Sequence, residues 1–338
     1  MRIISEIGEK RLIAEFIRPF FNETNSPEGV GDDCAMVRAD SQLVLLSTDR
    51  VPADLISFRL GILDFAGLGR YLAALNVSDI AACGGSPKAL LLNFGLPGTF
   101  AYEDLVSLCR GVREMSARCE CPVLGGDLSS ASELSLSATV MGLVPPGSVL
   151  TRRGARPGDT VFVSRPIGRT PAAFAYHLQC PASVLTGEEV VDINRQFTAL
   201  EPMIELGRNL AACGQCSSCM DNTDGLGQTL CELALSSGVA FFVDAESVIV
   251  DGVVRRIAES INMDSRMLAF SAGADLSLVG TLKGAWSQAA VRERLGFVVT
   301  VIGQVGDGEG AWFRDRDGAK RIACGGWNYF MPSGAPQP

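Results

Sequence analysis

The stretch Gln42-Leu43-Val44-Leu45-Leu46-Ser47-Thr48-Asp49 is an apolar run that ends in two hydroxyls and a carboxylate. A short apolar run bounded by polar residues predicts a buried β-strand. Such a strand would deliver Ser47, Thr48 and Asp49 to the end of a sheet. The fold is therefore predicted to hold hydroxyl and carboxyl groups where this strand ends, at one end of a sheet.

The segments on either side of this strand continue an alternation of helices and strands. An amphipathic helix is predicted over residues 6–20, before the strand. Residues 64–82 return to helical spacing, and within them Asn76 and Asp79 are three residues apart, so they share one helix face. Further along, the pattern predicts a strand over 88–96, a helix over 103–112 and a second strand over 134–140.

A segment rich in proline, glycine and arginine, 145–159, divides the 338 residues near residue 150. The length favours two domains, which we place at 1–150 and 151–331 with a loose tail at 332–338. The second half has an α+β pattern with late glycine turns at Gly303 and 306–310. Its predicted elements are strands at 160–164, 239–243, 275–282 and 298–305, and helices at 170–179, 194–212 and 225–237.

The composition excludes several classes of function. The chain is 47% hydrophobic and 20% charged, which is typical of a soluble folded protein, and its net charge of −9 argues against nucleic acid or anionic lipid as a partner. His177 is the one histidine, so a histidine-rich metal site is excluded. No segment resembles a membrane span or a signal peptide. We therefore expect the 11 cysteines to be reduced and the protein to be cytoplasmic.

Several acids stand at strand ends or in glycine-rich turns, in segments nearly without basic residues. They are Asp32, Asp33, Asp49, Asp79, Asp127, Asp221 and Asp224. Such acids need a countercharge, and Mg²⁺ supplies it because it prefers carboxylate and water oxygens and often bridges to phosphates. The alternative is that each acid only caps a helix or forms a turn.

Seven motifs occur in an order that resembles the thiamine-monophosphate kinase family, which belongs to the aminoimidazole-ribonucleotide synthetase-like superfamily. The resemblance covers nearly the whole chain. The motifs are Gly29-Val30-Gly31-Asp32-Asp33-Cys34-Ala35, Ser47-Thr48-Asp49, Asn76-Val77-Ser78-Asp79, Gly125-Gly126-Asp127, Thr151-Arg152-Arg153-Gly154-Ala155-Arg156-Pro157-Gly158-Asp159, Met220-Asp221-Asn222-Thr223-Asp224-Gly225-Leu226 and Gly326-Trp327-Asn328-Tyr329-Phe330.

The resemblance implies an α/β (α+β) fold, in which the N-terminal domain adds strands to a dimeric barrel and the C-terminal domain has a mixed sheet flanked by helices. It also implies a homodimer that binds ATP and Mg²⁺ near the dimer interface. The implied Mg²⁺ ligands are Asp33, Ser47, Thr48, Asp49, Asp79, Asp127, Asp221 and Asp224. Of these, Asp49, Asp127 and Asp224 are the expected catalytic residues.

The same resemblance assigns contacts with the two substrates. Gly126, Arg152 and Thr223 fall where the family contacts ATP, and Trp327 falls where an aromatic side chain flanks the acceptor. An arginine offers bidentate donors to a phosphate, and a glycine lets the backbone approach a nucleotide closely. A surface arginine, an ordinary tight turn and a buried anchor for the C-terminal strand are the respective structural alternatives.

The acceptor side departs from the family pattern. Ala274 stands where the family has an acidic substrate contact, and Ile56 lies near the place of an expected histidine. Thr223 replaces a more usual serine, which is a conservative change. The residues therefore predict an intact nucleotide site and an altered acceptor site.

Two further features have structural and functional interpretations. Cys213, Cys216 and Cys219 have the spacing of soft-metal ligands, although a fourth ligand at matching spacing is missing and buried cysteines are common in packed strands. His177 lies in a helical segment without companion ligands, which favours a packing or surface role.

The leading hypothesis is an ATP- and Mg²⁺-dependent small-molecule kinase that phosphorylates thiamine monophosphate or a related acceptor by direct in-line transfer, a reaction that needs charge neutralisation more than a base. One alternative is another reaction of the superfamily, in which ATP activates an amide or carbamoyl oxygen for dehydration or cyclisation. The other is a nucleotide-binding paralogue without turnover.

Overall fold

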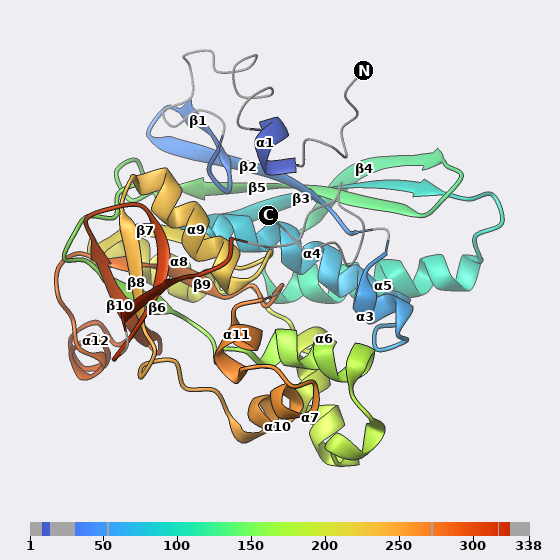
Figure 1. Cartoon of the computed structure of the whole chain (residues 1–338). Coiled ribbons are helices and arrows are strands. Elements are labelled where there is room, and N and C mark those ends of the chain that lie inside the picture. Colours follow the sequence, from blue (N-terminus) through green and yellow to red (C-terminus); the bar gives the residue numbers. More distant parts are fainter. Residues whose placement is uncertain (1–8, 14–30, 53, 272, 317, 325–338) are drawn as a thin grey trace, which may run out of the picture.

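Two β-sheets, each packed against helices, form the fold (Figure 1). The computed structural model describes residues 9–13, 31–52, 54–271, 273–316 and 318–324. The first sheet is built from residues 35–144 and the second from residues 160–321, and the chain passes from one to the other through the segment predicted to separate the domains. A boundary near residue 150 stays a prediction.

The first sheet has five strands in the order β1-β2-β5-β3-β4. Only β3 and β4 pair in parallel, and the other neighbours are antiparallel. The strands are β1 (Ala35–Ala39), β2 (Gln42–Arg50), β3 (Ser86–Leu96), β4 (Val123–Ser130) and β5 (Ser135–Val144).

One face of this sheet is packed on helices and the other is exposed to varying degrees. Along β5, Leu136, Ala138 and Val140 are buried while the residues between them are not, as the alternation in the sequence predicts. Helices α4 (Phe65–Ala82) and α5 (Tyr102–Arg118) lie below the sheet in Figure 1 and pack against each other.

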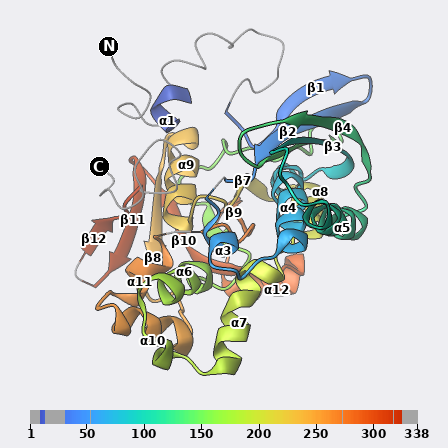
Figure 2. The same ribbon diagram turned by 90° about the vertical axis from the view of Figure 1, so that its right-hand side faces the viewer.

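Helix α4 is buried on nearly all sides, because it packs on the first sheet, on α5 and on elements of the second half (Figure 2). Its sequence is apolar around the whole circumference, which is typical of a central helix. Asp64 caps the N-terminus by accepting a hydrogen bond from the backbone N–H of Gly67 at 2.7 Å. This helix therefore carries its few polar residues into the interior of the molecule.

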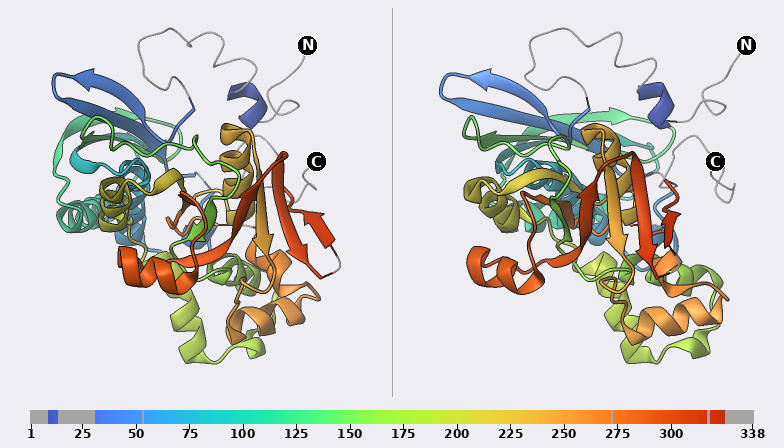
Figure 3. Two further views of the ribbon diagram at one scale, coloured as in Figure 1. Left: turned by 90° about the vertical axis from the view of Figure 1, so that its left-hand side faces the viewer. Right: turned by 60° about the vertical axis from the view of Figure 1, so that its left-hand side comes forward.

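The second sheet has seven strands in the order β12-β11-β8-β10-β6-β9-β7 (Figure 3). It is mixed, because β8 and β11 are parallel while the other pairs are antiparallel. The strands are β6 (Thr160–Val163), β7 (Cys216–Asp221), β8 (Ala240–Asp244), β9 (Leu278–Leu282), β10 (Thr300–Gly306), β11 (Gly310–Asp315) and β12 (Gly318–Arg321).

Apolar clusters lie on both faces of this sheet. In β6, Val161 and Val163 belong to one cluster and Phe162 to another, because successive side chains point to opposite faces. The remaining helices are α1 (Glu9–Leu12), α3 (Ile56–Arg59), α6 (Arg169–Gln179), the 3₁₀ turn η3 (Ala182–Val184), α7 (Gly187–Thr198), α8 (Ile204–Cys213), α9 (Leu226–Ser237), α10 (Gly252–Ser260), α11 (Ser265–Ala269) and α12 (Gln288–Leu295).

The structure confirms most predicted elements and corrects three. Residues 194–212 contain the end of α7 and most of α8, which are separated at Pro202 because proline lacks the N–H that a continuous helix needs. Gly303 is not in a turn but within β10, at an irregularity in its pairing. Gly125 and Asp127 lie within β4, so the predicted glycine turn is wrong. Of the predicted helix 6–20, residues 9–12 form α1, while residues 6–8 and 14–20, like the tail at 332–338, lie outside the described residues.

The prediction that all cysteines are reduced is wrong for one pair. Cys231 on α9 and Cys324, just after β12, form a disulfide. The two residues meet because α9 packs against β11, the neighbour of β12. Nine other cysteines are free. Across the described part of the chain, the structure contains no helix that is long and apolar enough to span a membrane.

Candidate active site between the two sheets

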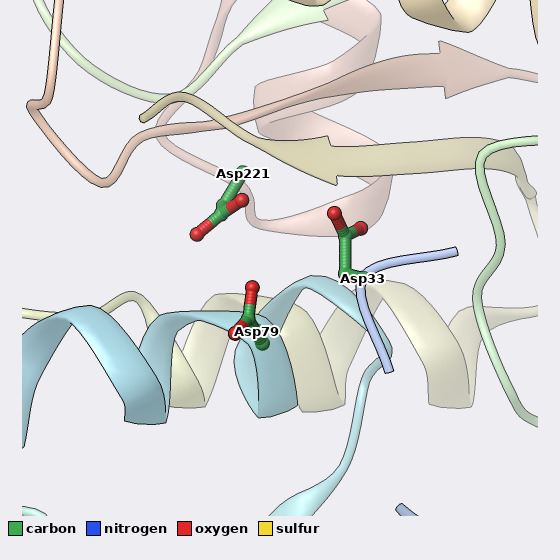
Figure 4. A group of neighbouring side chains, drawn as sticks. All are labelled: Asp33, Asp79 and Asp221. Carbon is green, nitrogen blue, oxygen red and sulfur yellow. The ribbon is translucent and has the colours of Figure 1, made fainter. Parts of the chain in front are cut away.

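Three buried aspartates converge where the two halves of the chain meet (Figure 4). Asp33 precedes β1, Asp79 lies on α4, and Asp221 ends β7. One carboxylate oxygen from each lies within 4.8 Å of the others. The exposed fractions are 8% for Asp33, 7% for Asp79 and 1% for Asp221. Acids that the sequence separates by up to 188 positions (221 minus 33) thus form one group.

Serine hydroxyls orient two of the three carboxylates. Ser47 on β2 donates a hydrogen bond to Asp79 Oδ2 at 2.6 Å. Ser78, which is fully buried on α4, donates to Asp221 Oδ2 at 2.5 Å. This second bond joins α4 to β7, a strand of the second sheet. Charge-assisted bonds of this kind are stronger than neutral ones, so they fix the carboxylates firmly.

Arg152, in the segment between the sheets, contacts the third carboxylate. Its Nε and Nη2 donate to Asp33 Oδ1 at 3.0 and 2.6 Å, and its backbone N–H donates to Asp32 Oδ1 at 2.6 Å. Burial lowers the pKa of the guanidinium, but the charge of Asp33 more than offsets this and raises it. The second oxygen of Asp33, Oδ2, is buried without a hydrogen-bond partner among the described residues.

The electrostatics of the group are dominated by burial. Burial raises the pKa of Asp79 well above its usual value, and the charges of Asp49, Asp221 and Asp33 raise it further. Burial and the charge of Asp33 raise the pKa of Asp221 in the same way. For Asp33, burial raises the pKa and Arg152 opposes the change. The site therefore favours protonated carboxyls or bound cations.

Asp49 lies beside this group on β2. Its pKa is raised by burial, partly offset by a hydrogen bond with Asp79 and raised further by the charge of Asp224. Asn76, which is fully buried on α4, holds its backbone: Oδ1 accepts from the N–H of Asp49 at 3.0 Å. Asn76 and Asp79 therefore do act on one side of α4, as their spacing predicts. Thr223 and Asp224 are half-buried in the loop after β7.

Other predicted site residues lie away from the three aspartates. Thr48 is exposed and donates to the carbonyl of Ala138 at 3.0 Å, on the side of β2 opposite to Ser47. Asp127 is exposed in β4, opposite Asn93 of β3. A Cβ at Gly126 would lie 1.9 Å from the carbonyl oxygen of Leu92. Close strand packing is therefore a sufficient reason for that glycine.

Two of the three acceptor-side positions, Ile56 and Ala274, lie within the described residues. Trp327 lies outside the described residues. Ile56 begins α3 and is half-buried, and Ala274 is half-buried in the segment before β9. The chain therefore has apolar side chains at both positions where the family pattern is polar.

The cysteine and histidine motifs make contacts within the protein. Cys213 and Cys216 each donate to a nearby backbone carbonyl, and within the described residues no three cysteines gather at metal-ligand distances. Nε2 of His177 lies 2.6 Å from Oδ1 of Asn194, which links α6 to α7. The packing role that we expected for His177 is consistent with this contact.

The sequence did not single out Ser78 or Asn222 as site residues. Ser78 precedes Asp79, and Asn222 follows Asp221, where each is almost fully buried. A polar residue next to an acid, inside an otherwise apolar helix or strand, is the signal that indicates such a role.

The geometry fits a hard divalent cation. Three carboxylates offer oxygen ligands, and one oxygen of Asp33 is a buried acceptor without a hydrogen-bond partner in the described residues. Mg²⁺ binds such oxygens and commonly retains contacts to phosphate. Arg152 adds a cationic group beside them, so the residues present suit a nucleotide phosphate bound with metal.

Known proteins are similar to this chain in sequence and fold. The family model "AIR synthase related protein, N-terminal domain" matches residues 31–144, which contain the first sheet. A thiamine-monophosphate kinase of Pyrococcus horikoshii is 28% identical over 333 residues, 96% of this chain and 97% of the relative. One from Methanopyrus kandleri is 32% identical over 286 residues, 83% of this chain and 84% of the relative.

A solved structure agrees over the whole length. The structure described as "AaThiL complexed with AMPPCP and TMP" has a TM-score of 0.81 and 25% sequence identity, and the match covers 97% of this chain and 99% of that one. The chain belongs to the thiamine-monophosphate kinase family.

Proposed function

We propose that this protein uses ATP and Mg²⁺ to phosphorylate thiamine monophosphate by direct in-line transfer. The observation that carries the proposal is the buried group of Asp33, Asp79 and Asp221 with Arg152 beside it. Relatives named as thiamine-monophosphate kinases, and a related structure described with AMPPCP and TMP, support the choice of both substrates.

The metal would be held by the acids of the site. We assign it to Asp33, Asp79 and Asp221, with Asp49 and Asp224 at its edge and Ser47 orienting Asp79. Bound Mg²⁺ would neutralise the ATP phosphates and align the transferred phosphoryl group. We retain Asp127 on the resemblance alone, and we leave out Thr48 because its hydroxyl is bonded to Ala138.

The remaining proposed contacts concern the nucleotide and the acceptor. Arg152, Thr223 and Gly126 are kept as contacts of ATP by resemblance; the guanidinium of Arg152, which donates to Asp33, is a group that can also donate to phosphate. Asp49 and Asp224, whose charges act on each other, are the proposed catalytic carboxylates. Trp327 remains the proposed aromatic neighbour of the acceptor.

A second copy of the chain is the proposed partner. All eight residues of β4 are exposed, including Leu124 at 69% and Leu128 at 65%. Leu91 on the neighbouring strand is 49% exposed. An apolar sheet edge of this kind is a ready pairing surface. It supports the proposal that the first sheets of two protomers join into a barrel near the ATP site.

The compartment is proposed from the cysteines. Nine cysteines of the described residues are free and one pair is disulfide-bonded; the predominance of free thiols supports a reducing environment such as the cytoplasm. We propose no nucleic acid partner, because the chain carries a net charge of −9.

Product analysis with labelled ATP tests the proposal. The protein is incubated with Mg²⁺, ATP and thiamine monophosphate, and the expected products are ADP and thiamine diphosphate. ADP with inorganic phosphate and a dehydrated product would indicate the amide-activation alternative. Tight ATP binding without any ADP would indicate a paralogue without turnover, and a screen of other acceptors would follow either result.

A further inference from the structure

The loop between Asp221 and Asp224 holds a buried asparagine that the proposed chemistry does not use. Asn222 is 3% exposed. Its Oδ1 accepts hydrogen bonds from the N–H of Gly225 at 3.1 Å and from the hydroxyl of Thr229 at 3.2 Å. Because a buried amide bonded on this side cannot rotate freely, the loop that carries the two acids is fixed at its centre.

The other end of the same amide reaches a second segment, Gly273–Ser277, which leads into β9. Nδ2 of Asn222 donates to Oδ1 of Asp275 at 2.9 Å. That oxygen also accepts from the N–H and the hydroxyl of Ser277, at 2.9 and 2.6 Å. Asp275 therefore ties its own segment to the loop that carries the metal-site acids.

The backbones of the two segments are joined as well. The N–H of Asn222 donates to the carbonyl of Ser277 at 2.8 Å, and its carbonyl accepts from the N–H groups of Asp275 and Leu276, each at 3.2 Å. Leu276 has φ +52°, which a non-glycine residue adopts only where its surroundings determine it. These bonds supply that determination.

The two segments are also closely packed against each other at Gly273. A Cβ at Gly273 would lie 2.8 Å from Cα of Gly225 and 3.2 Å from Nδ2 of Asn222. Backbone-to-backbone contact of this closeness makes the two segments one unit. The first segment of that unit carries the proposed metal acids Asp221 and Asp224, and the second carries Ala274, an acceptor-side position of the family pattern.

We infer that Asn222 and Asp275 form a positioning pair, which locks the Asp221–Asp224 loop to the Gly273–Ser277 segment so that metal binding and acceptor binding share one rigid support. The inference rests on the proposed function for the identity of the acceptor side. Neither residue is assigned a contact with ATP or with the acceptor.

Exchange of the two side chains is the central experiment. Asn222→Asp keeps an acceptor for Gly225 and Thr229 but replaces the donor to Asp275 with a like charge. We expect the dissociation constant of Mn²⁺, measured by paramagnetic resonance in the presence of AMPPCP, to rise about tenfold, as for loss of a buried hydrogen bond to a charged group. The KM for thiamine monophosphate should rise with it.

The double variant Asn222→Asp/Asp275→Asn returns a donor to the pair from the opposite side. Both constants should recover to within about threefold of the wild type, because the coupling between neighbours is restored. Asn194→Asp, a chemically matched change at the contact with His177, should leave both constants unchanged. If Asn222→Asp does not fold, Asp275→Asn alone serves as the single variant.

The readouts separate this inference from the proposed function. Unchanged Mn²⁺ and KM values in a folded but less stable single variant would overturn the positioning role, as would a double variant no better than the single one. If the wild type does not convert thiamine monophosphate, the proposed function fails, while the Mn²⁺ constants measured with AMPPCP still decide whether the pair positions the metal loop.

Discussion

The acidic site and the β4 edge depart in opposite ways from the usual pattern, in which charged side chains are exposed and large apolar side chains are buried. Asp79 and Asp221 are almost fully buried, while Leu124 and Leu128 are about two-thirds exposed. Charged groups are ordinarily buried only when they are paired, and large exposed apolar patches ordinarily mark interaction surfaces. Each region is therefore costly in an isolated chain, and each indicates what the chain binds.

The two regions differ in how their cost is contained. In the acidic site, Ser47, Ser78 and Arg152 supply hydrogen bonds that hold the carboxylates in place. At the β4 edge, the apolar side chains of Leu124 and Leu128 are exposed to solvent. Under the proposed function, the acidic site is held ready for a cation by these bonds, whereas the β4 edge would be covered only by a second chain.

Asp79→Asn is expected to have the largest effect, because it removes a proposed metal ligand and keeps the shape of the site. Activity should fall by about a thousandfold or more, from lost electrostatic stabilisation of the transferred phosphoryl group. The metal-free variant should nevertheless unfold at higher urea concentration, since a buried carboxylate is gone. Turnover of labelled ATP and urea titration measure the two. Asp264→Asn, at the N-cap of α11, is the control for activity. A variant that keeps full turnover would remove the acidic site from the reaction.

Cys324→Ser tests how much the disulfide stabilises the half of the chain that carries Asp221. The disulfide closes a loop of 93 residues between Cys231 and Cys324. Its loss should lower the free energy of unfolding by up to about 4 kcal/mol, mainly by releasing the unfolded chain. Urea titration of the variant, and of the wild type with a dithiol reductant, should give the same shift. Equal midpoints with and without reductant would mean that the bond contributes nothing.

Leu128→Lys should weaken the proposed dimer by about tenfold to a hundredfold, because it places a charge on the pairing edge. Sedimentation velocity over a concentration series gives the dissociation constant. Leu235→Lys changes another exposed leucine, which is 78% exposed on α9, and should leave association unchanged. A wild type that sediments as a monomer at all concentrations would end the proposal that β4 is covered by a second copy.

The stability of the metal-free protein should fall as the pH rises above the unfolded-state pKa of 3.8. The folded-state pKa values of Asp79 and Asp221 are raised by burial above the unfolded value of 3.8, so the folded state binds more protons in this window and loses stability as they leave. One pKa unit corresponds to about 1.4 kcal/mol. Urea midpoints at pH 5 and 8, with EDTA or with excess Mg²⁺, should show a smaller slope when Mg²⁺ is present. Identical slopes would contradict cation binding at this site.

Local patterns were enough to find most of the elements, but not to classify the glycines. Strand β5 follows from its two-residue alternation, and α4 was predicted from helical spacing although nearly all of its residues are buried. Gly125 and Gly126 were assigned to a turn on composition, yet they are in β4, where close packing against Leu92 requires a glycine. Whether a glycine pair turns the chain or admits a neighbouring strand depends on a contact distant in sequence.

The sequence indicated the acidic residues of the candidate site but not how they are arranged in space. Asp33, Asp49, Asp79, Asp221 and Asp224 were identified from acids in unusual settings and from the order of the motifs. The partners Ser78 and Asn222 were missed, because their importance arises from contacts with Asp221 and Asp275 that only folding creates. Asp127, with the same local motif character, stays apart in an exposed strand.

By itself the sequence determined the family, the mixed α/β class and the presence of a single histidine beside many carboxylates. These features depend on residue identity and on the local period of the sequence. The tertiary structure alone decided which acids share a site, which of two glycine roles applies, and that Cys231 meets Cys324. The physical reason is that burial, and the pKa shifts and pairings that follow from it, depend on segments that are far apart along the chain and adjacent only after it folds.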